Sequence, residues 1–111
     1  MTQTAGRYRI VFVTCPSIAQ ARRIGRSVVE KKLAACANIV TGVESIYRWR
    51  GKVERAREVL VVMKTTDGRL RELETEVKRM HSYQVPEFIV LPIVAGSPKY
   101  LGWIRENASY T

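Results

Sequence analysis

The sequence is poor in the residues that form tight metal sites and disulfide frameworks. It contains one histidine and two cysteines, and Cys15 and Cys36 do not form a C-x-x-C pair. A tight copper or zinc site takes three or four protein ligands, and a disulfide-stabilised small fold takes several cysteines. We therefore expect two free thiols and no obligatory cofactor.

Long apolar runs and catalytic constellations are also missing. No segment approaches the ~20 apolar residues of a membrane span, and the short polar stretch 1–6 has no signal-peptide core. No nucleophile–base arrangement, glycine-rich phosphate loop or paired acid cluster is present. The sequence therefore predicts a cytoplasmic protein that has no membrane partner and is not an enzyme.

The composition is that of a folded domain with a large surplus of positive charge. Of the 111 residues, 46% are apolar and 26% are charged, which predicts one domain over 1–111 with its core at about 7–106. The net charge of +9 raises the hypothesis of a basic nucleic-acid-binding module. The basic residues are dispersed over several segments, however, so a solvated surface is the favoured interpretation and a nucleic-acid partner is not expected.

Hydrophobic periodicity predicts an α+β fold. The predicted strands cover 8–14, 36–49, a return strand from the turn at 50–52 to residue 66, and 88–94, and the predicted helices begin after Ser17, Asp67 and Ser97. This order is the ferredoxin-like βαββαβ pattern with an extra C-terminal helix. The pattern places the second and fourth strands at the sheet edges, where Pro92 and a bulge at Gly42 are tolerated.

The second predicted strand is too long for the domain. Its 14 residues would span about 45 Å, whereas a compact domain of this length is roughly 34 Å across. The hairpin must therefore project beyond the core or fold back at Gly42. A projecting arm would expose Ile46, Tyr47 and Trp49, and natural proteins rarely leave such edges unpaired. We expect a second copy of the chain to cover it.

Several segments together resemble a known family. They are LAACAN at 33–38, SIYRWRGK at 45–52, KTT at 64–66, HSYQVPE at 81–87, LPI at 91–93 and YLGW at 100–103. In this order and spacing they resemble the CutA family of divalent-cation tolerance proteins, over about 9–105. The resemblance implies a protomer similar in architecture to the PII signalling proteins, assembled as a homotrimer. It also implies a cytoplasmic, non-catalytic binding role in tolerance of copper and other divalent metal ions.

His81 is the residue that the resemblance implies as a metal ligand. Copper ligation in the family involves a cysteine and adjacent histidines, and this chain has Val13 and Met80 at two of those positions. We therefore expect His81 to bind Cu(II) or another divalent cation only weakly. The alternative is a histidine that caps the end of the second helix.

The remaining candidates form a predicted ligand cleft between the hairpin and the segment after the second helix, across a subunit boundary. They are Lys64, Trp49, Tyr83, Glu87 and Cys36. Lys64, followed by two threonines, favours an anion and hence a PII-like sensor of small ligands such as nucleotides. The alternatives are a strand-end lysine whose stem packs on the surface, aromatics that pack in an interface, and a structural thiol.

Overall fold

The computed structural model describes residues 3–4 and 6–110, so residues 1, 2, 5 and 111 of the expected domain lie outside the described part. Its elements follow in the order β1 (Gln3–Thr4), β2 (Tyr8–Cys15), α1 (Ile18–Glu30), β3 (Cys36–Trp49), β4 (Lys52–Thr66), a 3-10 turn (Asp67–Arg69), α2 (Leu70–Met80), β5 (Ile89–Pro92), β6 (Ala95–Gly96) and α3 (Pro98–Asn107).

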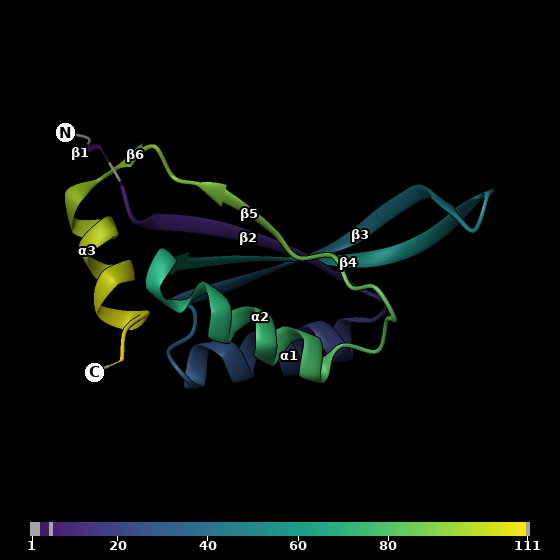
Figure 1. The fold of residues 1–111 in the computed structure, drawn as a ribbon, viewed down its shortest axis with the longest axis horizontal. Helices are drawn as coiled ribbons and strands as arrows, with labels where there is room; N and C mark the ends of the chain where they lie inside the picture. Colours follow the sequence, from purple (N-terminus) through teal and green to yellow (C-terminus); the bar gives the residue numbers. More distant parts are fainter. Residues whose placement is uncertain (1–2, 5, 111) are drawn as a thin grey trace.

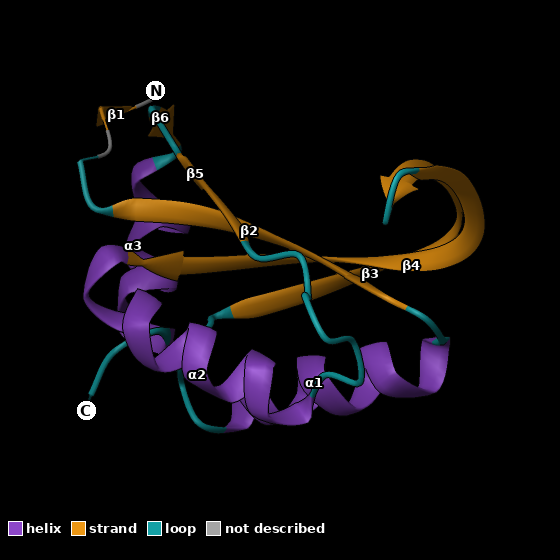
Figure 2. Ribbon diagram, turned by 45° about the vertical axis from the view of Figure 1, so that its right-hand side comes forward, coloured by secondary structure: helices purple, strands orange, loops and turns teal. Residues whose placement is uncertain are grey.

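The main sheet has the strand order β3-β4-β2-β5, and every neighbouring pair is antiparallel. Helices α1 and α2 lie side by side on one face of this sheet (Figures 1 and 2). The predicted ferredoxin-like topology, with β3 and β5 at the edges and an added helix α3, is confirmed. Strands β1 and β6 form a second, two-stranded sheet that periodicity did not predict.

Serine residues cap the N-termini of α1 and α3, as predicted. The Ser17 hydroxyl accepts the Gln20 backbone N–H at 3.2 Å, and the Ser97 hydroxyl accepts that of Tyr100 at 3.4 Å. Each bond satisfies one of the free N–H groups in a first helical turn. These caps fix the entry points of α1 and α3.

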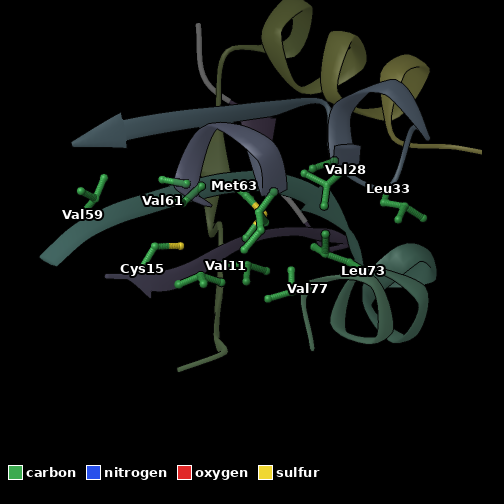
Figure 3. Packing of buried hydrophobic residues seen from close by; sticks show 13 residues of the cluster. Val11, Cys15, Val28, Leu33, Val59, Val61, Met63, Leu73 and Val77 are labelled. Atoms are coloured by element: carbon green, nitrogen blue, oxygen red, sulfur yellow. The ribbon is translucent and has the colours of Figure 1, made fainter. Parts of the chain in front are cut away.

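The core lies between the sheet and the two packed helices. Val11, Val61 and Met63 from the sheet meet Leu73 and Val77 of α2, and all five are fully buried (Figure 3). Leu101 and Ile104 of α3 belong to a second, smaller cluster at the end of the sheet. On the opposite face of the main sheet, α3 covers only one end, where Tyr8 packs with Leu101 and Ile104. The rest of that face is covered by no helix in the described part of the chain (Figure 2).

The predicted hairpin does project from the body of the protein. The pairing register of β3 and β4 shifts between Val40 and Val43, where Gly42 has a φ of +78°. This bulge begins the part that we call the arm, residues 43–58, which extends away from the helices and curls at its tip (Figures 1 and 2). A two-residue turn closes it, with Arg50 and Gly51 at φ of 51° and 80°. The longest dimension of the molecule is 45 Å.

The Glu76 carboxylate of α2 links α2 to the C-terminal end of α1 through hydrogen bonds and an ion pair. Its side chain is 9% exposed and accepts hydrogen bonds from the Ser27 hydroxyl at 2.5 Å, from Lys31 at 2.8 Å and from Arg79 at 2.8 Å. The hydrogen bonds from Arg79, Lys31 and Ser27 hold the pKa of Glu76 well below its usual range.

We expect Glu76→Gln to lower the free energy of unfolding by about 2 kcal/mol, because it removes charged hydrogen bonds between the helices. The folded pKa of Glu76 is lowered, so this stabilisation is complete above the unfolded pKa of about 4.3 and is lost as pH falls toward the folded pKa. Urea denaturation should thus show the gap to wild type narrowing below about pH 4. Glu74→Gln, which loses only a surface pair with Lys78, should change stability far less.

Candidate functional site

A cavity of about 790 Å³ lies between the arm and the segment that follows α2. We call it the arm cavity. It is lined by Thr14, Glu44, Ser45, Ile46, Tyr47, Trp49, Glu58, Tyr83, Gln84, Val85, Pro86 and Glu87. This volume is in the range of small-molecule sites, which are typically about 300–1,000 Å³.

Glu58 and Tyr83 form the polar centre of the arm cavity. Glu58 is 9% exposed, at the base of the arm where β4 enters the core, and it accepts a hydrogen bond from the Tyr83 hydroxyl at 2.7 Å. Burial raises the pKa of Tyr83, and the hydrogen bond to Glu58 and the negative charge of Glu58 raise it further. The phenol is therefore protonated at neutral pH and acts as a donor to the carboxylate.

Glu87 adds a second partly buried carboxyl group on the same wall. Burial and the nearby charge of Glu58 raise the pKa of Glu87 above its ordinary value. A carboxylate whose ionisation is disfavoured by burial and by a neighbouring charge is stabilised by a cation placed beside it. The arm cavity therefore has the electrostatics of a cation site.

The structure brings together three of the five residues predicted for the ligand cleft. Trp49, Tyr83 and Glu87 all line the arm cavity, and Tyr47 lies beside Trp49 on the same lining. The prediction placed this meeting across a subunit boundary. It occurs within one chain, because residues of the arm and residues 83–87 of the same chain line one cavity.

Lys64 and Cys36 lie elsewhere. They are paired in register across β3 and β4, on the sheet away from the arm. The Lys64 ammonium donates to the Tyr100 hydroxyl at 3.1 Å and lies 5.4 Å from the centre of that ring. The Cys36 thiol contacts the Asn38 side-chain oxygen at 3.5 Å. Both cysteines are free thiols, as predicted.

His81 ends α2 and has both ring nitrogens engaged. Its backbone N–H donates to the Val77 carbonyl, as in a helix C-cap. The Tyr83 backbone N–H donates to Nδ1 at 3.1 Å, so Nε2 carries the proton and donates to the Thr14 carbonyl at 2.7 Å. A metal ion at His81 must displace one of these bonds. Within residues 3–4 and 6–110, no group of three or more His, Cys, Asp or Glu side chains is arranged to hold a metal.

Sequence reasoning missed Glu44 and Glu58 as lining residues. In the sequence, both are charged residues within a strand that is predicted to be solvent-exposed. One signal was available for Glu58, because it directly precedes the apolar run from Val59 to Met63 and so lies where the strand enters the core.

Known proteins with similar sequences and structures support both this fold and the family resemblance of the sequence motifs. The family described as CutA1 divalent ion tolerance protein matches residues 9–107. The chain belongs to the CutA1 family. It is 48% identical over 98 residues to the divalent-cation tolerance protein CutA of Thermus thermophilus, covering 88% of this chain and 95% of that protein. The family is named for tolerance of divalent ions and for no reaction.

Solved CutA structures share the whole architecture. The structure of the Thermus thermophilus protein superposes with a TM-score of 0.90 at 46% identity, covering 92% of this chain and 99% of that one. The Synechococcus elongatus CutA structure gives 0.93 at 31% identity, covering 98% and 96%. Mouse protein CutA is 44% identical over 101 residues, which is 91% of this chain but 57% of that protein. The chain thus spans nearly all of the Thermus relative and about half of the mouse one.

Among the helices of the described residues, none has the length and apolarity needed to cross a membrane.

Proposed function

We propose that this CutA1-family chain is a non-catalytic homotrimer that binds small cationic ligands and takes part in the cytoplasmic response to divalent metal ions, copper among them. Its family membership supports the metal role. The observation that carries the assembly is the part of the sheet face beyond α3, which no helix of the described residues covers and which we call the open face.

The open face is formed by three rows of paired residues across the main sheet. The rows are Leu91, Ile10, Lys64 and Cys36; Ile89, Phe12, Val62 and Asn38; and Thr14, Leu60 and Val40. Ile89 is 50% exposed and Val40 is 45% exposed. A sheet face with this many exposed apolar side chains is normally covered by another layer.

A second copy of the chain is the occupant that fits the open face. The face is continuous with the projecting arm, so one neighbour can cover both the open face and apolar arm residues outside the arm cavity, such as Val53. The number of three subunits comes from the resemblance to the family. Light scattering should therefore give three times the 12.7 kDa chain mass, and a single species of chain mass at micromolar concentration would contradict the proposal.

The ligand cleft of this proposal is the arm cavity, built around Trp49, Tyr83 and Glu87. Its lining is acidic, which supports a cation rather than an anion as its ligand. The rival hypothesis of an anion or nucleotide sensor depends on Lys64, which lies outside the arm cavity. Titration with ATP separates the two, because only the rival predicts binding that Lys64→Met abolishes.

We expect Cu(II) to bind at His81 with a Kd in the micromolar range or weaker. A metal ion there must displace a hydrogen bond to a ring nitrogen, and no group of three ligating side chains surrounds it in the described part of the chain. Calorimetric titration should show the binding weakened in His81→Ala and unchanged in Ser82→Ala, with folding of both variants checked by circular dichroism. Nanomolar binding that survives in His81→Ala would place the copper ligands elsewhere.

A further inference from the structure

The arm cavity is an acidic region of a strongly basic protein. The chain has 19 Lys and Arg against 10 Asp and Glu, yet among the described residues the lining contains Glu44, Glu58 and Glu87 and no Lys or Arg. Three of the ten acidic residues thus line one cavity whose lining contains no basic side chain among the described residues. A lining with three carboxyl groups and no basic side chain favours a cationic ligand over an anionic one.

Glu58 is a buried carboxylate that forms no ion pair with a positively charged side chain among the described residues. Its side chain accepts one hydrogen bond, from the neutral Tyr83 hydroxyl, and among the described residues no Lys, Arg or His forms an ion pair with it. A carboxylate that is nine-tenths buried is costly unless it is paired or hydrogen-bonded to donors. The remaining acceptor capacity of Glu58 lines the arm cavity, where a bound cation would meet it.

The walls of the arm cavity fit an organic cation better than a metal ion. Tyr47, Trp49, Ile46, Val85 and Pro86 supply aromatic and aliphatic surface beside the carboxylates. Transition metals need several converging nitrogen or sulfur donors, which this lining lacks among the described residues. Aromatic faces next to carboxylates are instead the surroundings that bind ammonium groups carrying apolar substituents.

We propose that the arm cavity binds an organic ammonium ion, with its N–H groups donating to Glu58 and Glu87 and its apolar part against Tyr47 and Trp49. This inference rests on the proposed role of the arm cavity as the ligand cleft and names its ligand class. Carboxylate acceptors favour an amine that retains N–H donors over a quaternary ammonium ion. Tyr83 positions the Glu58 carboxylate through its hydroxyl.

The test is calorimetric titration of the full chain with three matched probes. Benzylamine carries a cation with N–H donors, benzyl alcohol is its neutral analogue, and benzyltrimethylammonium is a cation without N–H groups. We expect benzylamine to bind at least about tenfold more tightly than benzyl alcohol, with benzyltrimethylammonium between them. Because the pKa of Glu87 is raised, benzylamine affinity should fall as pH drops through that pKa and the carboxyl group becomes neutral.

The variants assign the binding to the arm cavity. Glu58→Gln should weaken benzylamine binding by about tenfold or more, while Glu30→Gln, the same change on an exposed turn of α1, should leave it unaltered. Equal affinity for amine and alcohol, benzylamine binding that survives Glu58→Gln, or Glu58-dependent binding of Cu(II) or Mg²⁺ without amine binding would each overturn the inference. Light scattering on the same sample separates the two proposals: a trimer that binds no amine overturns this inference alone, and a monomer overturns the proposed assembly.

Discussion

Val62→Glu is expected to convert the proposed trimer into monomers at micromolar protein concentration. Val62 lies in the middle row of the open face, between Phe12 and Asn38 in the pairing register. If this face packs against other copies, the substitution places a carboxylate from every subunit in one apolar interface. Desolvating each charge costs several kcal/mol, and the charges also repel one another. The protomer should remain folded, because Val62 alternates with the buried Val61 and Met63 and so faces away from the core beneath α1 and α2.

The measurement is light scattering, with circular dichroism as the check on folding. Val29→Glu is the matched control, since Val29 is 38% exposed on α1, on the side of the sheet opposite to the open face. We expect Val29→Glu to keep the wild-type mass. If Val62→Glu is folded and keeps the mass of a trimer, the open face is not the surface through which the copies associate.

The second large effect is a loss of stability expected on replacing Arg69, which donates hydrogen bonds to backbone carbonyls at the C-terminal end of α1. Arg69 is 5% exposed, and its guanidinium donates to the Lys32 carbonyl at 3.1 Å, to the Lys31 carbonyl at 3.3 Å and to the Glu72 carboxylate at 3.2 Å. The Arg69 Cζ atom lies 4.0 Å from the centre of the Tyr110 ring. Lys32 has a φ of 58°, the left-handed conformation in which many helices end.

Arg69→Ala should lower the free energy of unfolding by roughly 2–4 kcal/mol, because it removes several charged hydrogen bonds and the contact with Tyr110. Arg69→Lys should recover only part of the loss, since an ammonium group cannot bridge two carbonyls as a planar guanidinium does. Arg71→Ala, at an exposed position near the start of α2, is the control. Urea denaturation at one protein concentration measures all three, because assembly contributes to the apparent stability by mass action. A loss in Arg69→Ala no larger than in Arg71→Ala would contradict the capping role.

Local features of the fold could be predicted because neighbouring residues alone determine them. Ser17 and Ser97 accept N–H groups only three residues away. Gly42 marks a bulge because a positive φ costs glycine little. Pro92 lies in an edge strand, where its missing N–H leaves no interior ladder bond unmade. Each of these signals acts within a few residues, so one sequence is sufficient to find it.

The candidate site was predictable only in part. Trp49, Tyr83 and Glu87 could be singled out from the sequence, and the structure places them together in the arm cavity. Lys64 was grouped with them, although its partner is Tyr100, 36 residues further along the chain. The burial of Glu58 could not be foreseen from alternation along the arm, because it depends on where the loop after α2 passes.

The order of the helices and of the main-sheet strands could thus be predicted from the sequence, as could the projecting arm, the edge strands and membership of the CutA1 family. These follow from periodicity, turn residues and motif spacing, all of which are written along the chain. Three properties required the tertiary structure. The arm meets residues 83–87 within one subunit, Glu58 is buried without a matching positive charge among the described residues, and most of one sheet face has no helix of the described residues on it. Those properties depend on contacts between residues far apart in sequence, and burial and electrostatics are set by such contacts.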